Sequence, residues 1–278
     1  MSKDQRTADA FATSWNNLPA GSVYTREQFE DWMAPLSEQD FCGKDVLEMG
    51  CGNGSLLVHT AAWAPRRLVG VDLGSSVETA RANLKLANHP EAEVVQADLT
   101  AYSSAGFDLV YCIGVLHHLQ EPQTGFRAVL RNVRPGGRFH CWVYAREGNG
   151  IVVALVDPIR RLASHLPWWL TKYGIATPLA VPFYLYAKAL RRIVGRSPDR
   201  LRNAPLRDYC LWIATREFAF FRHVAFDQLV TPRTVYVRRG EIEAWLAGAA
   251  GIEPGSSYIV FRNGNSWKFG GKMRDSQQ

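Results

Sequence analysis

The chain has 278 residues, of which 47% are hydrophobic and 21% are charged, and its formal net charge is +6. This is the composition of a globular protein with enough apolar side chains for one large core, and it excludes an intrinsically disordered chain. No apolar run reaches the roughly 18 residues that a transmembrane helix needs.

The cysteines and the first residues indicate where the protein works. The five cysteines are odd in number and none lie at C-x-x-C spacing, which argues against a disulfide framework and against a zinc site. Residues 1–17 are polar and lack the apolar stretch of a signal peptide. We therefore expect no metal ion and a cytoplasmic protein.

Two helices are predicted within residues 1–40, and strands then alternate with helices over residues 44–144. Near-continuous apolar runs predict strands buried on both faces, and apolar residues at i, i+3, i+4 and i+7 predict helices. Ser75 and Glu78 are expected to form a capping box, and the Pro-Gly-Gly at 135–137 is expected to end a helix. The alternation predicts an α/β fold with a doubly wound parallel sheet. The predicted strands are 45–49, 68–72, 93–97, 107–113 and 139–144, and the predicted helices are 55–63, the one after Ser75, and 126–133.

The alternation stops after the fifth predicted strand. Residues 150–232 contain 7 of the 14 prolines and show only short helical patterns, around 151–165, 179–194 and 206–221. The α/β pattern returns with a helix around 242–249 and two strands, 257–262 and 266–270, joined by the hairpin signal Asn263-Gly264-Asn265. The predicted domains are N-terminal helices at 1–40, an α/β domain at 41–149 and 233–278, and a helical cap or substrate lid at 150–232.

A glycine-rich turn follows the first predicted strand. Glycines stand at 50, 52 and 54, and the second predicted strand ends at Asp72. Glycine lets a ligand approach the main chain, N–H groups at the start of a helix bind polar groups, and a carboxylate accepts hydrogen bonds from both hydroxyls of a ribose. A dinucleotide fingerprint would need a glycine at position 55, where this chain has Ser55. The turn therefore predicts a nucleoside-containing cofactor that is not a dinucleotide.

Five motifs in this order resemble those of the class I S-adenosylmethionine-dependent methyltransferases. The resemblance covers roughly residues 44–144 and, more faintly, residues 236–272. It implies a mostly parallel seven-stranded Rossmann-like sheet with an inserted helical cap, and an enzyme whose cofactor is S-adenosyl-L-methionine. The matching motifs are Glu48–Gly54, Asp72, Gln96-Ala97-Asp98-Leu99, Phe107–Leu119 with its His117-His118 pair, and Leu130–Arg138.

The resemblance also implies which residues bind the cofactor. Asp72 matches the ribose-binding acid, Asp98 matches the adenine-side acid, and Gly50 to Gly52 match the backbone around the methionine part. Three apolar residues are expected to enclose the purine. Each acid taken alone can also be a strand-end or helix-capping residue. The expected cofactor-binding residues are Glu48, Gly50, Cys51, Gly52, Asp72, Leu73, Asp98, Leu99 and Ile113.

Methyl transfer from a sulfonium is an in-line displacement that needs no metal, so the protein supplies positioning and, where needed, a base. His117 and His118 follow the fourth predicted strand, at the sheet edge where such folds bind ligands. Tyr144 ends the fifth strand and can line the acceptor site, and Trp15 and Tyr24 can close over the cofactor. These residues can instead cap or pack structural elements. The expected catalytic residues are His118, favoured over His117, and Tyr144.

The positive charge is concentrated at residues 146–240, which hold 16 basic and 6 acidic residues. The segment also contains many aromatic residues. Three interpretations compete: an aromatic-lined lid for an apolar or aromatic acceptor, an interfacial patch for a lipid-like substrate, and a nucleic-acid surface. Cys112-Ile113-Gly114 differs from the Asn-Pro-Pro-aromatic motif of enzymes that methylate base amino groups, so we favour the lid and expect no nucleic-acid partner. Arg222, His223 and Asp227 near its end can face the acceptor or join helices.

The sequence thus predicts a methyltransferase that acts on an O, N or C atom of a small-molecule metabolite. The alternatives are another use of the sulfonium, such as intramolecular cyclisation that releases methylthioadenosine, methylation of a lipid-like or RNA substrate, and a non-catalytic cofactor-binding module. Weak contact with a membrane surface is compatible with each of these. The intact acids Glu48, Asp72 and Asp98 argue against the non-catalytic module.

Overall fold

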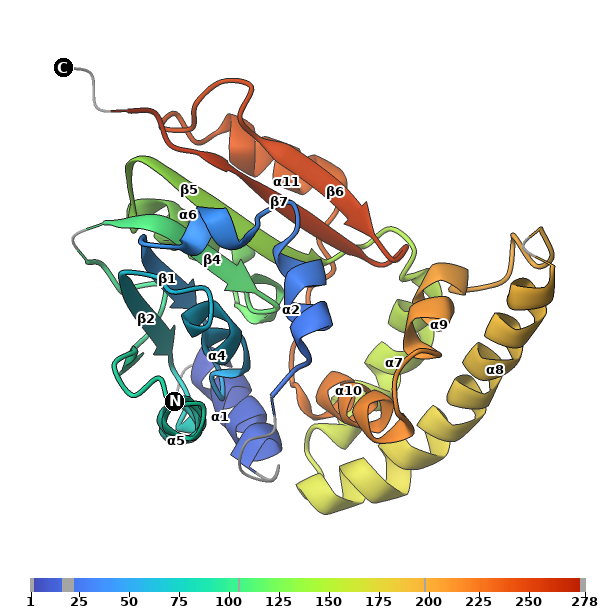
Figure 1. The fold of residues 1–278 in the computed structure, drawn as a ribbon. Coiled ribbons are helices and arrows are strands. Elements are labelled where there is room, and N and C mark those ends of the chain that lie inside the picture. Colours follow the sequence, from blue (N-terminus) through green and yellow to red (C-terminus); the bar gives the residue numbers. More distant parts are fainter. Residues whose placement is uncertain (1–2, 17–22, 105, 198, 276–278) are drawn as a thin grey trace. The chain divides into compact units, whose positions relative to one another are not determined.

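The computed structural model describes residues 3–16, 23–104, 106–197 and 199–275, and the chain divides into two compact units (Figure 1). The chain leaves the first unit after Tyr144 and returns to it at Arg233, so each unit contains segments that are distant in the sequence. The first unit comprises Met1–Tyr144, Arg233–Val260 and Trp267–Gln278, and the second comprises Ala145–Pro232 and Phe261–Ser266.

The first unit is built around a seven-stranded sheet with the strand order β3-β2-β1-β4-β5-β7-β6. β1 pairs in parallel with β2 and β4, β2 pairs with β3, and β4 pairs with β5. The chain therefore winds outward from β1 in both directions, and such a switch point is where doubly wound sheets bind ligands. The predicted doubly wound, mostly parallel sheet is confirmed. The strands are β1 Asp45–Met49, β2 Arg67–Asp72, β3 Glu93–Gln96, β4 Phe107–Ile113, β5 Val133–Tyr144, β6 Tyr258–Arg262 and β7 Ser266–Lys272.

Helices flank this sheet, and among the described residues three helices rather than two precede β1. α1 packs against α5, and α2 packs against α4. Thr25 caps α2, because its hydroxyl accepts a hydrogen bond from Gln28 N. The elements are α1 Lys3–Asn16, α2 Arg26–Met33, α3 Glu38–Phe41, α4 Ser55–Ala61, α5 Ser76–Leu86, the 3₁₀-helix η1 Leu116–His118, α6 Pro122–Arg131 and α11 Arg239–Ala247.

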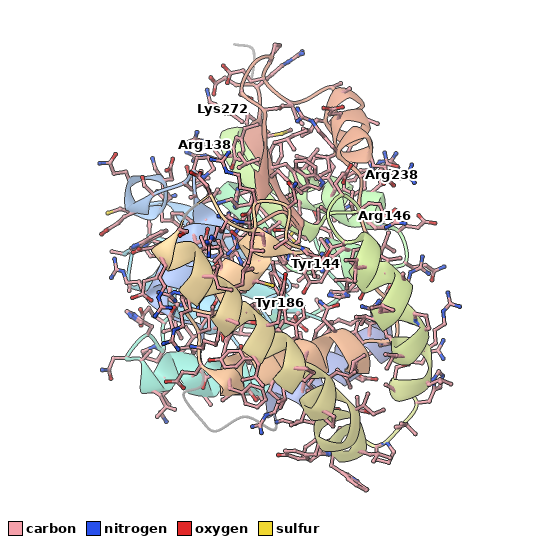
Figure 2. All side chains as sticks on the ribbon, turned by 90° about the vertical axis from the view of Figure 1, so that its right-hand side faces the viewer. Arg138, Tyr144, Arg146, Tyr186, Arg238 and Lys272 are labelled. Atoms are coloured by element: carbon pink, nitrogen blue, oxygen red, sulfur yellow. The ribbon has the colours of Figure 1, made fainter. Side chains whose placement is uncertain are left out.

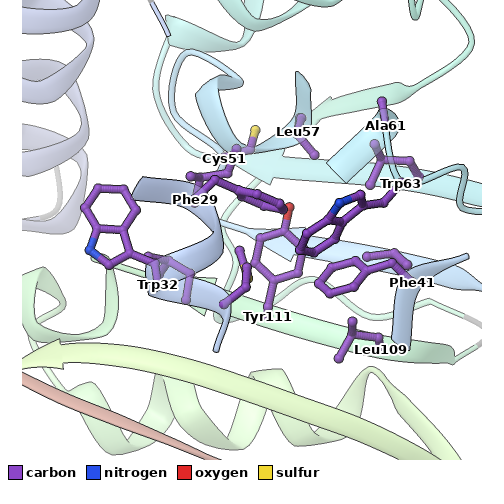
Figure 3. Packing of buried hydrophobic residues seen from close by; sticks show 14 of the residues in the cluster. Phe29, Trp32, Phe41, Cys51, Leu57, Ala61, Trp63, Leu109 and Tyr111 are labelled. Atoms are coloured by element: carbon purple, nitrogen blue, oxygen red, sulfur yellow. The ribbon is translucent and has the colours of Figure 1, made fainter. Parts of the chain in front are cut away.

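An aromatic core holds α2, α3 and α4 on one face of the sheet (Figure 3). The ring of Trp63 lies 4.5 Å from that of Phe29 and 4.7 Å from that of Phe41, measured between centroids. Phe41 in turn lies 6.1 Å from Tyr111 of β4, and Tyr111 is fully buried. Truncating one such ring typically costs about 3–5 kcal/mol, so this core fixes where α2 stands beside the sheet.

β5 begins earlier than predicted. Phe107 pairs with Val133 but Leu109 pairs with Arg138, so the Pro-Gly-Gly at 135–137 forms an irregularity within the strand pair. The prediction that this Pro-Gly-Gly ends the preceding helix is therefore wrong. α6 ends at Arg131, and the Asn132 side chain donates a hydrogen bond to a carbonyl of its last turns.

The capping box predicted at the start of α5 is also absent. The Ser75 side chain makes no capping hydrogen bond, and Glu78 pairs with Arg81 instead. The turn is closed by the main chain, where Glu78 N donates to Ser75 O at 3.3 Å. Ser75 does precede the start of a helix, as predicted, but Glu78 pairs with Arg81 rather than with the main chain at Ser75.

The second unit is helical. The single helix expected over 206–221 is two helices, α9 and α10, separated by Ala214–Glu217. Lys188 of α8 donates a hydrogen bond to the Ala214 carbonyl at 3.0 Å, which satisfies the backbone where α9 ends. Across the described residues, no helix has both the length and the apolar character needed to cross a bilayer. The elements are α7 Gly150–Ala163, the π-helix η2 Leu170–Ala176, α8 Thr177–Arg196, α9 Arg207–Ile213 and α10 Phe218–Val230.

Candidate cofactor and acceptor site

Three glycines shape the turn between β1 and α4. Gly50, Gly52 and Gly54 have φ angles of +86°, +52° and +76°, which only glycine adopts without strain. A Cβ on Gly50 would lie 2.3 Å from the Val115 side chain, so the turn directly contacts the segment that follows β4. A Cβ on Gly52 would meet the indole nitrogen of Trp15 at 3.8 Å. The turn thus presents bare main chain between Val115 and Trp15.

Asp72 stands at the end of β2 and is tied to this turn. Its Oδ2 accepts a hydrogen bond from Gly52 N at 2.9 Å, and its Oδ1 accepts one from Gly74 N at 2.8 Å. Burial raises the pKa of the Asp72 carboxyl, while the hydrogen bonds from Gly74 and Gly52 oppose the rise. Hydrogen bonds from the Ser76 hydroxyl and the Leu73 N–H also lower this pKa. The carboxylate thus faces several donors beside the glycine turn, and its contact with ribose hydroxyls stays a prediction.

Asp98 follows β3, and its side chain braces its own loop. Oδ1 accepts hydrogen bonds from the main-chain N–H of Thr100 at 2.8 Å and from its hydroxyl at 2.7 Å. The expected apolar residues are placed nearby in the chain: Leu99 is buried after β3, and Ile113 is buried at the end of β4. Leu73 follows β2 and is half-buried. All four stand at or beyond the carboxyl ends of strands, and their contact with a purine stays a prediction.

Glu48 and Cys51 lie beneath the turn. The Glu48 side chain is buried, and its Oε2 accepts a hydrogen bond from the Tyr111 hydroxyl at 3.0 Å. The same hydroxyl lies 2.7 Å from the Thr60 hydroxyl. Burial raises the pKa of the Glu48 carboxyl to about 8. Cys51 is also buried, and its N–H donates to Val71 O at 3.0 Å. Both residues support the turn, and direct cofactor contact by either stays a prediction.

His117 and His118 form η1 immediately after β4, and both are buried. His118 Nδ1 lies 3.0 Å from the Arg233 carbonyl oxygen and 3.4 Å from the Thr234 hydroxyl. A ring nitrogen that faces a carbonyl oxygen carries the proton, so the neutral ring presents Nε2 as its proton acceptor. The main chain at Arg233 therefore selects the tautomer that a general base requires.

Aromatic rings surround the two histidines. The Tyr144 ring lies 4.2 Å from that of His117 and 6.2 Å from that of His118. Phe11 of α1 lies 4.8 Å from His118, and Tyr236 lies 6.1 Å from Tyr144, all between centroids. The structure thus brings the three expected catalytic residues together, at the carboxyl ends of β4 and β5. Tyr144 is marked in Figure 2.

Two tryptophans that the sequence analysis did not single out extend this group. The Trp142 ring lies 5.1 Å from Tyr144 and 5.9 Å from Trp32 of α2, and Trp32 lies 4.8 Å from Tyr24. Tyr24 lies 5.5 Å from Trp15, so Trp15, Tyr24, Trp32, Trp142 and Tyr144 form one aromatic row. The period of two along a strand pairs Trp142 with Tyr144 and was a usable signal. Trp32 had none, because only the packing of α2 brings it to β5.

Three buried polar groups belong to or adjoin the aromatic row and have no hydrogen-bond partner in the part of the chain that the structure describes. They are the side-chain amide of Gln28 and the indole nitrogens of Trp32 and Trp142. Gln28 is 1% exposed and precedes Trp32 by one turn of α2, so the two share a helix face. Buried polar groups normally have partners. These three therefore indicate where polar atoms of a ligand can bind.

The polar residues expected near the end of the cap lie on α10 in the second unit. His223 Nε2 and Asp227 Oδ2 are 3.3 Å apart, so the predicted shared helix face is confirmed. The Arg222 guanidinium lies 5.7 Å from the centre of the Tyr173 ring, a cation–π distance. These contacts all form within the second unit.

Comparisons with known proteins agree with the geometry of the first unit. Residues 46–137 match a family model described as a methyltransferase domain. An uncharacterised protein of Synechococcus sp. is 24% identical over 229 residues, covering 80% of this chain and 49% of that protein. A ubiquinone biosynthesis O-methyltransferase of Neisseria meningitidis is 34% identical over 102 residues, covering 35% and 43%. The one of Thiobacillus denitrificans is 34% identical over 134 residues, covering 47% and 55%.

The chain spans about half the length of the curated relatives it matches. Among solved structures, a magnesium protoporphyrin IX methyltransferase from Synechocystis with bound S-adenosylmethionine superposes on 99% of this chain and 98% of its own, with a TM-score of 0.55 and 13% identity. At that identity the likeness shows a shared fold. The match to the methyltransferase domain and the shared fold together cover the glycine turn, Asp72 and the histidine pair.

Proposed function

We propose that the chain is a class I S-adenosylmethionine-dependent methyltransferase, because residues 46–137 match a methyltransferase domain and the fold is shared with a methyltransferase. We further propose that it transfers the methyl group to an O, N or C atom of a small-molecule acceptor in the cytoplasm. One observation carries the proposal: the glycine turn after β1 contacts Val115, which leads directly into His117 and His118. A cofactor on the turn and an acceptor at the histidines would be neighbours, as an in-line displacement requires.

The described residues fit this cofactor. The Asp72 carboxylate is held where it can accept the ribose hydroxyls, and the glycine turn leaves main chain accessible to the methionine part. The aromatic row can stabilise the positive sulfonium through cation–π contacts. When bound, the cofactor supplies a methyl group that is already activated by the sulfonium charge.

We assign the general base to His118. Its Nδ1 is occupied by the Arg233 carbonyl, so Nε2 can take the proton from an acceptor hydroxyl or amine as that atom forms its bond to the methyl carbon. The rings of His117 and Tyr144 would then line the acceptor and exclude water. Imidazole is a suitable base near neutral pH.

A phenolic hydroxyl is the acceptor that we favour. Tyr144 is half-buried and backed by the buried ring of Trp142, and an aromatic acceptor could stack against it. The relatives from Neisseria and Thiobacillus are named as O-methyltransferases, which supports an oxygen atom over nitrogen or carbon. We further propose that residues 150–232 help to select the acceptor.

The test is an assay with methyl-labelled S-adenosylmethionine and matched pairs of phenols and anilines. We expect labelled phenyl ethers together with S-adenosylhomocysteine. Release of methylthioadenosine would support the intramolecular cyclisation, and labelled anilines would move the acceptor to nitrogen. Failure of the cofactor to bind in calorimetry would refute the enzymatic function, and tight selective RNA binding in a filter assay would refute a small-molecule acceptor.

A further inference from the structure

The second unit carries an exposed apolar surface on α7, η2 and α8, which we call the apolar cap face. On α7, Ile151, Leu155 and Leu162 are 48%, 63% and 75% exposed, at spacings that place them on one side of the helix. Soluble proteins seldom expose so many large apolar side chains in one region unless they bind something there. The face also includes Leu166 and Trp169 between α7 and η2, Tyr173 on η2, and Leu179, Leu185 and Ile193 on α8.

The charges beside the apolar cap face are positive. α8 contains four basic residues and no acid, and three of them, Arg191, Arg192 and Arg196, are exposed in its last two turns. The acid of α7, Asp157, is paired with Arg160 at 2.5 Å. The apolar residues at the start of α8 are thus followed by arginines with no acid on the same helix to balance them.

We propose that the apolar cap face docks on the surface of a membrane that contains anionic lipids. Amphipathic helices at an interface bury apolar side chains about 5–10 Å into the headgroup region, while basic residues remain with the lipid phosphates. Exposed tryptophan and tyrosine favour that layer, and this region supplies Trp169, Tyr173 and Tyr186, the last of which is marked in Figure 2. Because none of the described helices can span a bilayer, the contact is peripheral.

A lipid surface fits both the exposed apolar side chains and the positive charge of this face, whereas other partners fit only one of the two. Two copies meeting face to face would bring arginines against arginines without acids between them, and like charges repel. A nucleic acid would neutralise the arginines but would leave the leucines in water, since its contacts are mainly polar. An anionic membrane neutralises Arg191, Arg192 and Arg196 and also removes Leu155 and Leu162 from water.

The test is flotation of the whole chain with vesicles of phosphatidylcholine, alone or mixed with phosphatidylglycerol. We expect binding to the mixed vesicles only, and weaker binding at high salt because of charge screening. The triple variant Leu155→Asp, Leu162→Asp, Leu185→Asp should bind at least about tenfold less, since it removes apolar area and adds negative charge. Leu86→Asp is the matched control, because Leu86 is equally exposed, at 63%, on α5 of the first unit.

A second set of variants tests the charge. Replacing Arg191, Arg192 and Arg196 by Gln should lower the partition coefficient by about a hundredfold, as expected for three basic residues near an anionic surface. The control replaces three exposed bases of the first unit by Gln, namely Lys44, Lys85 and Arg127.

Circular dichroism verifies that each variant is folded. Flotation needs neither cofactor nor acceptor, so its outcome is independent of the proposed methyl transfer. Failure of the native chain to float with anionic vesicles would overturn the proposal. The proposal would also be overturned if the α8 arginine variant and the control variant of the first unit lost vesicle binding equally. A concentration-dependent dimer that the leucine substitutions abolish would overturn it too.

Discussion

Asp72 has a structural role, because its oxygens hold Gly52 and Gly74, and we predict that the same carboxylate binds the ribose. We expect Asp72→Ala to raise the cofactor dissociation constant at least tenfold, since charge-assisted hydrogen bonds contribute more than about 1.4 kcal/mol. Affinity should also fall in acid at a higher pH than for an ordinary aspartate, because burial raises the pKa of this carboxyl. Calorimetry measures both. Glu93→Gln, an exposed acid on the neighbouring strand, is the control. Unchanged affinity in Asp72→Ala would remove the ribose assignment.

Glu48 couples stability to pH. Burial raises its pKa from 4.5 to about 8, so the folded protein keeps a proton that the unfolded chain loses. The stability that protonated Glu48 contributes is fully present below 4.5, the pKa in the unfolded chain. It is lost as the pH rises through about 8, the pKa in the folded protein. We expect Glu48→Gln, which keeps an acceptor for Tyr111, to gain in Tm relative to the native chain between about pH 5 and pH 8. Thermal melts without cofactor test this, and a constant difference across that range would contradict it.

His118 faces a main-chain carbonyl through Nδ1, whereas His59 and His140 face one through Nε2. We expect His118→Gln to lower kcat by about 10²–10⁴, the usual contribution of a positioned general base, without changing cofactor affinity. The acidic limb of the kcat profile against pH should disappear with it. His89→Gln, which alters a half-buried histidine before β3, is the control. If kcat is unchanged for a phenolic acceptor, His118 is not the base.

At the scale of an element, the buried side of α2 is apolar except for the side-chain amide of Gln28 and the indole nitrogen of Trp32. Its Phe29 and Met33 are buried in the core, while Gln28 and Trp32 share another face and end in polar atoms without partners among the described residues. Leaving a buried amide unsatisfied costs about 1–3 kcal/mol. The helix therefore keeps a polar group at the expense of stability, as binding sites often do.

We expect Gln28→Met, which keeps the side-chain length, to raise Tm and at the same time to raise the KM for the acceptor or the dissociation constant of the cofactor. The stability gain follows from removing an unpaired amide, and the binding loss from removing its hydrogen bonds. Denaturant unfolding and steady-state kinetics measure the two effects. Gln5→Met on α1, a glutamine paired with Asp9, is the control. A gain in Tm without any loss of binding would show that Gln28 is structural only.

Elements were predictable where a local pattern suffices. β1 and β4 are near-continuous apolar runs, and both strands lie where the pattern placed them. The start of β5 was not predictable, because a Pro-Gly-Gly that ends a helix in one context forms a strand irregularity in another. The capping box at Ser75 failed for a similar reason, since Arg81 competes for Glu78.

For the whole molecule, the concentration of positive charge at residues 146–240 was visible in the sequence. Its meaning was not, because a leucine on an amphipathic helix looks the same whether it faces a core or water. Only the burial of each residue separates Leu190, which is inside the second unit, from Leu155 and Leu185, which are outside. That difference is what turns a basic, aromatic segment into a candidate membrane surface.

The sequence by itself predicted the central strands and the doubly wound sheet, because glycines, a strand-end acid and apolar periodicity are local features that act over a few residues. Its resemblance to a methyltransferase family indicated the cofactor class. Only the tertiary structure decided which residues surround the proposed site of methyl transfer. Val115 meets Gly50, the Arg233 carbonyl sets the tautomer of His118, and Trp32 reaches Trp142. Each of these contacts joins residues far apart in the chain, and such contacts are formed by the packing of the core rather than by any local pattern.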